Sequence, residues 1–169
     1  DTENLAEDFP SVGLSANTIH AATLRARRQD NQEKFIHDRV PIIVATIAFG
    51  MGIDKPDIRF VAHVNLPGNM ESYYQEIGRA GRDGAPAETL LMYGLDDVHQ
   101  RRRFIEEDGE DDIHKLREHK RLDALLAYCE AAFCRRKVLL SYFGDDIDPC
   151  GNCDNCLNPP NVIDGTELC

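Results

Sequence analysis

Pro41-Ile42-Ile43-Val44-Ala45 is a continuous apolar run of strand length. A run of this kind, unlike an alternating one, is typical of a parallel strand whose two faces are both covered. A charged helical segment over 23–39 precedes it, and a second strand-like stretch follows over 59–65. This alternation of strand and helix predicts an α/β fold with a mostly parallel sheet.

The expected elements divide the chain into two regions and a short tail. In the first region, residues 1–95, the other expected elements are the end of a helix over 2–9, strands over 16–21 and 89–93, and a helix over 70–79. The second region, residues 96–160, begins with a solvated helix and boundary loop over 96–112 and continues as one long helical stretch over 113–140. An apolar stripe marks that stretch: Leu122, Leu125, Leu126, Cys129 and Phe133. Residues 161–169 form the tail.

Composition and charge exclude several classes of protein. The chain has 169 residues, 42% of them hydrophobic, which suffices for one core or for one core with a small appendage. No stretch approaches the ~20 apolar residues of a membrane span. The polar start, Asp1-Thr2-Glu3-Asn4, shows no signal peptide and no methionine, so we expect a cut or processed end. A net charge of −11 argues against a stand-alone nucleic-acid binder, so any contact with nucleic acid must be local.

A second informative stretch is Tyr73-Tyr74-Gln75-Glu76-Ile77-Gly78-Arg79-Ala80-Gly81-Arg82-Asp83-Gly84. Its two arginines lie three residues apart at the end of a predicted helix, a spacing that directs both guanidinium groups to one side. A planar, permanently charged guanidinium suits phosphate recognition, and the neighbouring glycines allow a ligand close to the backbone. The alternative is an ordinary solvated helix end, which spacing alone leaves equally open.

The cysteines predict a metal site in the second region. Cys150, Cys153 and Cys156 have Cx2Cx2C spacing, which lets one short loop turn three sulfurs toward a common point. A tetrahedral metal needs a fourth ligand. Cys134 is favoured because it lies off the apolar stripe, and Cys129 is the alternative.

Structural zinc is the favoured occupant of this site. Disulfides are disfavoured in a chain without a secretory signal. A ferredoxin-type iron–sulfur cluster needs a further cysteine four residues after Cys156, where Pro160 stands. A four-cysteine iron–sulfur cluster that uses Cys134 stays open as an alternative, whereas a closed four-thiolate zinc site is a common way to stabilise a small appendage.

Three motifs stand in a fixed order along the chain. They are Thr46–Pro56 (Thr-Ile-Ala-Phe-Gly-Met-Gly-Ile-Asp-Lys-Pro), the run Gln75–Gly84, and the cysteine loop that follows Tyr142-Phe143-Gly144. Together they closely resemble the RecQ family of DNA helicases, and the resemblance extends from Glu3 to Pro160. It implies the second of two RecA-like domains, an α/β fold with a parallel sheet and flanking helices. A small, mainly helical zinc-binding subdomain would follow.

The resemblance also implies roles at a nucleotide cleft. Arg79 and Arg82 would face ATP bound on the partner domain, with one of them acting as an arginine finger. Gln75 would join them, and Asp54 would couple the nucleotide and DNA states. No Gly-x4-Gly-Lys-[Ser/Thr] loop and no Walker B segment occur in the chain. ATP and Mg2+ would therefore be bound mainly by the absent first RecA-like domain, and we expect the isolated chain neither to hydrolyse ATP nor to unwind DNA.

Further implied partners and ligands follow from the same resemblance. Thr46 and Gly50 would approach the backbone of the tracked DNA strand. The full-length protein would bind single-stranded DNA and duplex junctions, with no membrane, in the bacterial cytoplasm and nucleoid or in a eukaryotic nucleus. The family's zinc ligands match Cys134, Cys150, Cys153 and Cys156.

Two other functions are compatible with parts of the sequence. The acidic balance favours a non-catalytic, zinc-stabilised module that docks another protein. A different superfamily-2 motor, such as an RNA helicase, would share the arginine motif, but the cysteine platform argues against it.

Overall fold

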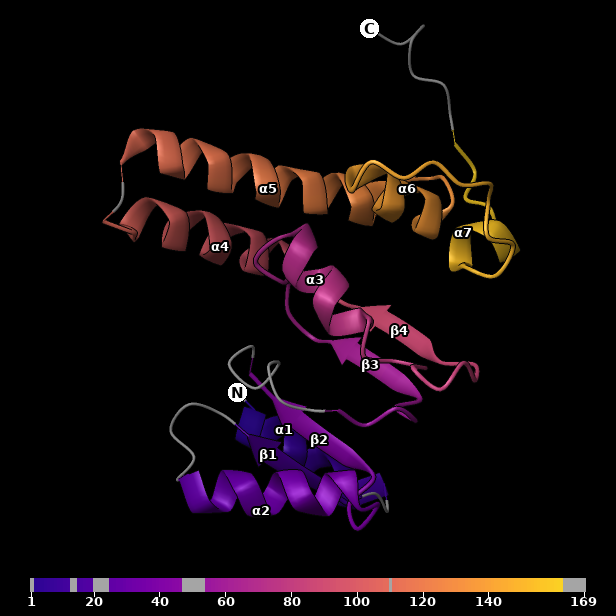
Figure 1. Ribbon diagram of the computed structural model, residues 1–169. Helices are drawn as coiled ribbons and strands as arrows, with labels where there is room; N and C mark the ends of the chain where they lie inside the picture. The colour runs from indigo at the N-terminus through magenta and orange to yellow at the C-terminus, as the bar shows by residue number, and fades with distance from the viewer. Residues whose placement is uncertain (1, 13–14, 20–24, 47–53, 110, 163–169) are drawn as a thin grey trace, which may run out of the picture. The chain divides into compact units, whose positions relative to one another are not determined.

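The computed structural model describes residues 2–12, 15–19, 25–46, 54–109 and 111–162 (Figure 1). These residues form two compact units. Unit 1 comprises Asp1–Phe60 and Arg79–Glu88, and unit 2 comprises Val61–Gly78 and Thr89–Cys169. The division between residues 95 and 96 that the sequence suggests stays a prediction.

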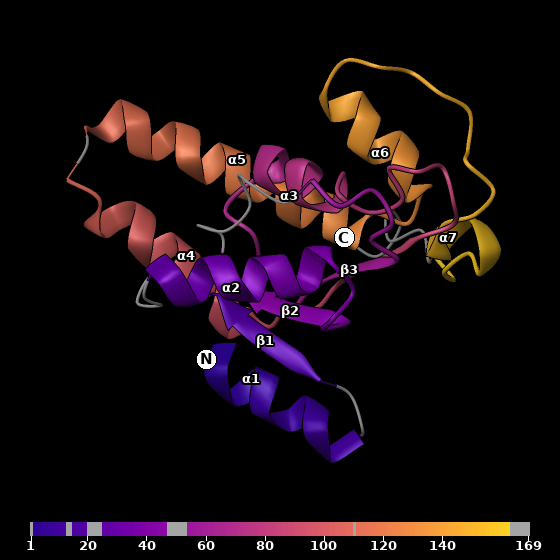
Figure 2. The same cartoon turned by 60° about the horizontal axis from the view of Figure 1, so that its bottom comes forward.

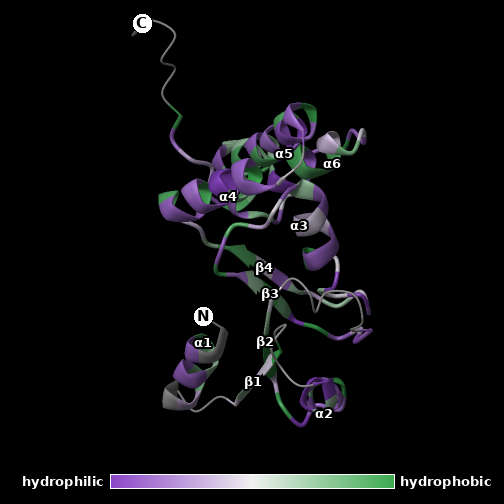
Figure 3. Cartoon of the chain, turned by 90° about the vertical axis from the view of Figure 1, so that its left-hand side faces the viewer, coloured by the Kyte–Doolittle hydropathy of each residue, from purple (hydrophilic) through white to green (hydrophobic). Residues whose placement is uncertain are grey.

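Unit 1 contains a parallel pair of strands between two helices. Its elements are α1 (Thr2–Asp8), the 3-10 helix η1 (Phe9–Val12), β1 (Ala16–Ile19), α2 (Arg25–Ile36) and β2 (Ile42–Ala45). The two strands pair in parallel, from Ala16 opposite Ile42 to Ile19 opposite Ala45. Figure 3 shows α1 and α2 on opposite sides of this pair. The parallel strand predicted from the apolar run is therefore confirmed, and both of its faces are covered.

The inward side chains of β2 form the core of unit 1. Ile42 and Val44 are buried together with Ala6 of α1. Asn31 of α2 is also buried, and its amide donates a hydrogen bond of 2.9 Å to the Thr18 carbonyl of β1. The bond gives this buried amide a partner, and it fixes α2 against the strand pair.

A second two-stranded sheet is formed by β3 (Phe60–His63) and β4 (Glu88–Leu91), with α3 (Met70–Ile77) between them in the chain. The Glu88 N–H donates to the Arg59 carbonyl at 2.9 Å, and the Met92 N–H donates to the His63 carbonyl at 2.8 Å. Both bonds join residues at the same sequence offset and in the same direction, so the two strands run parallel.

Unit 2 is mainly helical. Its remaining elements are α4 (Leu95–Glu107), α5 (Asp112–Glu130), α6 (Arg135–Tyr142) and α7 (Asp154–Leu157). Helices α4 and α5 lie side by side in Figure 1, and Figure 2 shows the loop after α6 running round to α7. One buried cluster joins α3, α5 and α6: Leu66, Met70, Tyr73, Leu122, Leu125, Tyr128 and Leu139. None of the helices in the described ranges is long and apolar enough to cross a membrane.

The single helical stretch predicted over 113–140 is wrong. Helix α5 ends at Glu130, Ala131 has an extended backbone with ψ of 132°, and α6 starts only after Cys134. Phe133, expected on the apolar stripe, lies in this break and is 75% exposed. Helical spacing aligns side chains only while the helix continues, so the stripe stops where α5 stops.

Candidate functional site

Four cysteine sulfurs gather in unit 2. The Sγ atoms of Cys134, Cys150, Cys153 and Cys156 all lie within 4.8 Å of one another. A tetrahedral zinc ion with Zn–S bonds of about 2.3 Å holds its sulfurs roughly 3.8 Å apart. The Cys134 and Cys153 sulfurs are 4.0 Å apart. Four soft donors at this spacing fit a structural zinc ion, and the fourth ligand is Cys134, as the sequence favours.

The local fold turns these sulfurs inward. Cys134 caps α6 and Cys153 caps α7, so each stands just before a first helical turn. The Cys134 Sγ accepts hydrogen bonds from the backbone N–H groups of Cys150 at 3.2 Å and Lys137 at 3.5 Å. Gly151 has φ of 72°, a left-handed conformation that glycine adopts without strain, and it allows the tight turn after Cys150.

Two polar side chains fix the cysteine loop to the break between α5 and α6. Asn155 donates to the Ala131 carbonyl at 2.7 Å. Arg135 donates to the Cys129 carbonyl at 2.8 Å and pairs with Asp154 at 3.1 Å. The sequence gives no signal for Asn155 beyond its place inside the cysteine motif. The carbonyls left without helical partners where α5 ends are thus bonded by Arg135 of α6 and by Asn155 of the loop.

The thiols ionise unequally. Burial opposes ionisation of Cys134, but the N–H groups of Cys150 and Lys137 outweigh it and lower the pKa of this thiol to about 6. Contact with Cys153 raises the pKa of Cys156 to about 11. Thiolates crowded in this way repel one another, and a divalent cation among them relieves that repulsion. The electrostatics of the donor set therefore also fit a metal ion.

Cys129 lies outside this cluster. It is partly buried on α5, packs against the core of unit 2, and has its pKa raised to about 11 by burial. An apolar setting of this kind keeps a thiol protonated. Cys129 is a core residue rather than a fourth ligand.

In unit 1, the arginine segment meets the end of the Thr46–Pro56 motif. The Arg82 Nη1 atom lies 3.2 Å from the Asp54 Oδ1 atom. Arg79 is half-buried in the same unit. The structure thus brings together two of the residues expected at the nucleotide cleft, although they are 28 positions apart in the chain.

The structure does not test the grouping of the other residues expected at the nucleotide cleft and the DNA backbone. Thr46 follows β2, is exposed, and donates its N–H to the Ile19 carbonyl at 3.1 Å. Gly50 lies outside the described residues. Gln75 is exposed on α3 in unit 2. The grouping of Gln75 with the arginines, and of Thr46 with Gly50, stays a prediction.

Two further residues shape this part of unit 1, and the sequence assigns no role to either. Lys55 is buried, and its Nζ atom lies 2.7 Å from an Asp38 carboxylate oxygen. Arg59 pairs with Asp83, the residue that follows Arg82. In the sequence, each of these two residues is a charged side chain near several aspartates. That pattern does not indicate which aspartate is the partner.

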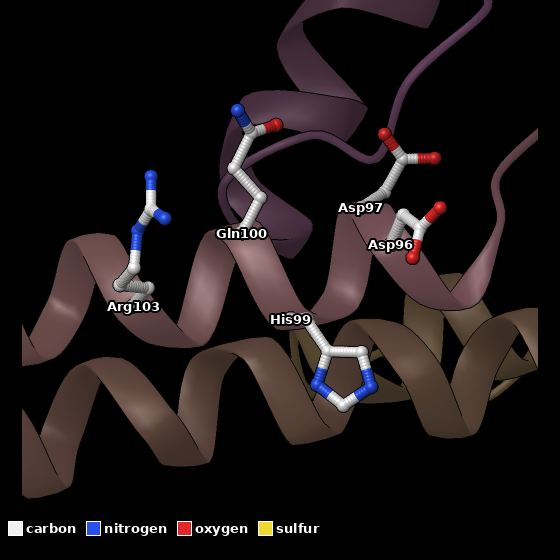
Figure 4. Close-up of a pocket in the computed structure, with 5 residues that line it drawn as sticks. All are labelled: Asp96, Asp97, His99, Gln100 and Arg103. Carbon is white, nitrogen blue, oxygen red and sulfur yellow. The ribbon is translucent and has the colours of Figure 1, made fainter.

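An open hollow of about 370 Å³ lies along α4, lined by Asp96, Asp97, His99, Gln100 and Arg103. Figure 4 shows His99 directed toward α5, whereas Asp97, Gln100 and Arg103 point away from it. All the lining residues come from one helix, and none is a predicted site residue. The hollow is therefore a feature of the α4 surface and not part of the candidate site.

Comparison with known proteins gives two family matches. The helicase conserved C-terminal domain matches residues 2–84, and the RecQ zinc-binding family matches residues 95–157. The ATP-dependent DNA helicase RecQ of Haemophilus influenzae is 47% identical over 164 residues, which cover 96% of this chain and 26% of that protein. RecQ of Bacillus subtilis is 42% identical over 168 residues, covering 99% and 28%. The chain spans about a quarter of the length of these curated relatives.

Solved structures support the fold. The DEAD-box protein SrmB of E. coli is similar with a TM-score of 0.52 and 26% identity, over 63% of this chain and 64% of that one. The expected fold class is confirmed: a RecA-like region with parallel strands and flanking helices precedes a helical zinc-binding region.

Proposed function

The chain belongs to the RecQ family of DNA helicases, and from that premise we propose that it is the second half of an ATP-driven DNA motor with its zinc platform. Residues 1–95 would be the second RecA-like domain, 96–160 the platform and 161–169 a tail. The observation that carries this proposal is the Arg82–Asp54 pair in a chain that also holds a four-cysteine centre. The RecQ zinc-binding match favours this function over a docking module and over another superfamily-2 motor.

In this proposal the arginines complete an active site that begins on another domain. ATP and Mg2+ are bound mainly by a preceding RecA-like domain, and closure of the cleft brings Arg79 and Arg82 to the transferring phosphoryl group. A guanidinium there offsets the charge that develops in the transition state. Gln75 orients the nucleotide side of the cleft. Asp54, which pairs with Arg82 at 3.2 Å, links the state of this arginine to the Thr46–Pro56 motif.

Movement along DNA follows from the same cycle. Thr46 and Gly50 contact the strand backbone, and opening of the cleft after hydrolysis shifts those contacts along it. The 3′-to-5′ direction comes from the family. With a net charge of −11, the chain offers only local contacts to single strands and duplex junctions. We propose a place of action where DNA is found, in the bacterial cytoplasm or the nucleus.

The cysteine centre has a structural task. Cys134, Cys150, Cys153 and Cys156 would hold one zinc ion, which links the α5–α6 break to the loop before α7. A closed four-thiolate site leaves no position for a substrate, so the ion supplies folding energy and no chemistry.

The proposal is tested by Arg82→Ala in the full-length helicase that carries this region. We expect DNA-stimulated ATP hydrolysis to be abolished, while ATP binding and zinc content stay at the wild-type level. Arg103→Ala is a matched control, because Arg103 is an exposed arginine on α4 with a loose ion pair to Glu107 at 3.5 Å. Unchanged turnover in Arg82→Ala contradicts the proposal. ATP turnover by the isolated 169 residues would contradict the expected division of the active site.

A further inference from the structure

Two segments of unit 1 that are distant in the sequence run side by side. The Gly81 N–H donates to the Ile58 carbonyl at 2.9 Å, and the Asp83 N–H donates to the Pro56 carbonyl at 3.2 Å. After the chain turns at 83–86, the Glu88 N–H donates to the Arg59 carbonyl at 2.9 Å, where the β3–β4 pair begins. Residues 54–59 therefore form the segment to which the arginine segment, residues 79–84, is hydrogen-bonded.

The Arg59 side chain links the 54–59 segment to the residues that follow Arg82. Its Nη2 atom pairs with the Asp83 carboxylate, and its Nη1 atom donates to the Pro86 carbonyl at 3.2 Å. Its Nε atom donates to the Asp57 carbonyl of its own turn at 2.8 Å. The rigid guanidinium fork thus holds the turn 83–86 at two points and the 54–59 segment at a third.

The turn that Arg59 holds is tight. Gly81 has φ of 64°, and a Cβ atom there would lie 2.9 Å from the Ala85 carbonyl oxygen. The Gly84 N–H donates back to Gly81 at 2.9 Å, and the Ala85 N–H donates to the Asp83 carboxylate at 3.1 Å. The Gly84–Gly81 bond closes a turn over 81–84 that contains Arg82 and overlaps the 83–86 segment held by Arg59. The direction in which the Arg82 guanidinium leaves the backbone therefore depends on the geometry of this turn.

We propose that Arg59 is a positioning residue for Arg82. It ties the carboxylate of Asp83 to the 54–59 segment, and so it fixes the backbone from which Arg82 reaches a phosphate. The inference rests on the proposed function of Arg82 in ATP hydrolysis. In this proposal Arg59 acts through Asp83 and Pro86 and would itself touch neither the nucleotide nor the reacting atoms.

The expected sizes of the effects on folding stability and on catalytic rate separate a positioning role for Arg59 from a merely stabilising one. The Arg59 and Asp83 side chains are 42% and 34% exposed, and exposed ion pairs contribute little to stability. Catalysis is more sensitive, because displacement of a catalytic group by about 1 Å can lower a rate by up to about a hundredfold. Loss of Arg59 should therefore affect turnover far more than folding.

The test uses the full-length helicase with Arg59→Ala. We expect kcat for DNA-stimulated ATP hydrolysis to fall by at least about tenfold, with the KM for ATP and the melting temperature unchanged. Arg59→Lys keeps a positive charge opposite the Asp83 carboxylate and leaves the Ala85–Asp83 bond in place, so it should regain part of the lost kcat. Arg102→Ala is the matched control, since Arg102 makes a comparably exposed pair with Asp123 at 2.9 Å. Its kcat should equal that of the wild type.

Three results would overturn the inference. They are a wild-type kcat in Arg59→Ala, a loss of kcat that only follows a fall in melting temperature, and an Arg59→Lys variant no more active than Arg59→Ala. The proposed function fails separately. If Arg82→Ala leaves turnover unchanged, the arginine-finger role is wrong whatever Arg59→Ala shows.

Discussion

Lys55 is a buried charge whose partners lie on both sides of it in the chain. Its side chain is 9% exposed, and its Nζ atom lies 2.7 Å from an Asp38 oxygen and 2.9 Å from an Asp57 oxygen. The ammonium group also lies 5.8 Å from the centre of the Phe35 ring. These contacts join the end of α2 to the turn that follows Asp54. One side chain therefore fixes the start of the 54–59 segment, to which the arginine segment is hydrogen-bonded.

Replacement of Lys55 should destabilise the chain in a pH-dependent way. Asp38 first, and then Asp57, raise the pKa of Lys55 above 10.5 against the opposing effect of burial. The stabilisation is therefore complete below pH 10.5 and is lost as the pH rises through the higher folded pKa. We expect Lys55→Met to lower the free energy of unfolding by about 2 kcal/mol at pH 7, less than for a fully buried pair.

Urea unfolding at pH 7 to 11 measures this effect. The difference in the free energy of unfolding between the wild type and Lys55→Met should become smaller above pH 10.5. Lys34→Met is the control, because Lys34 makes only an exposed pair with Asp30 on α2. The expectation is contradicted if the difference in free energy of unfolding stays constant up to pH 11. It is also contradicted if Lys55→Met loses no more stability than Lys34→Met.

At the scale of elements, polar side chains determine where helices begin. The Asn69 side chain accepts the Ser72 N–H at 2.9 Å at the start of α3. At the start of α4, Asp97 accepts the Gly94 N–H at 2.8 Å and the Asn65 amide at 2.9 Å. The second bond also ties α4 to the end of β3, so the cap orients the helix as well as starting it.

Asp97→Ala should weaken α4. The Gly94 N–H first, and then Asn65, lower the pKa of Asp97 below 3.8. Its contribution is thus present above pH 3.8 and is lost as the pH falls through the lower folded pKa. We expect the substitution to cost about 1 kcal/mol at pH 7, and the cost should shrink toward pH 2. Urea unfolding at both pH values measures it.

Asp96→Ala is the control for this prediction. Asp96 lies in the same first turn of α4 and carries the same charge, but only Asp97 accepts the capping bond from Gly94. If the two substitutions cost the same at pH 7, the effect comes from charge near the helix start rather than from the cap.

At the scale of the whole molecule, the four-cysteine centre stabilises a segment that has no hydrophobic core of its own. The chain over 144–160 contains one short helix, and none of its side chains is fully buried. The cluster of four sulfurs joins it to α5 and α6. A segment with so little apolar burial depends on cross-links of this kind for its fold.

Removal of a ligand should therefore release the metal and destabilise unit 2. We expect one zinc ion per wild-type chain and none in Cys153→Ser, with a free energy of unfolding lower by at least about 3 kcal/mol. Metal analysis and thermal melts measure both. Cys129→Ser, which changes a thiol outside the cluster, should keep its zinc. Loss of zinc from Cys129→Ser, or an iron–sulfur absorbance band in the wild type, contradicts the assignment.

Local patterns in the sequence were enough to predict much of this protein. The apolar run Pro41–Ala45 gave a parallel strand, and the Cx2Cx2C loop gave three thiolate ligands. The order of three motifs gave the family. The first two signals each lie within one element or one short loop, where side-chain period and spacing are fixed by backbone geometry.

Contacts between distant segments were decided only by the tertiary structure. The break at Ala131 took Phe133 out of the predicted stripe, whereas the choice of Cys134 as fourth ligand confirmed the sequence prediction. The return of the chain after α3 placed Asp83 against Arg59. Many aspartates could satisfy one arginine, and the pairing depends on which segments pack together, which periodicity and spacing do not specify.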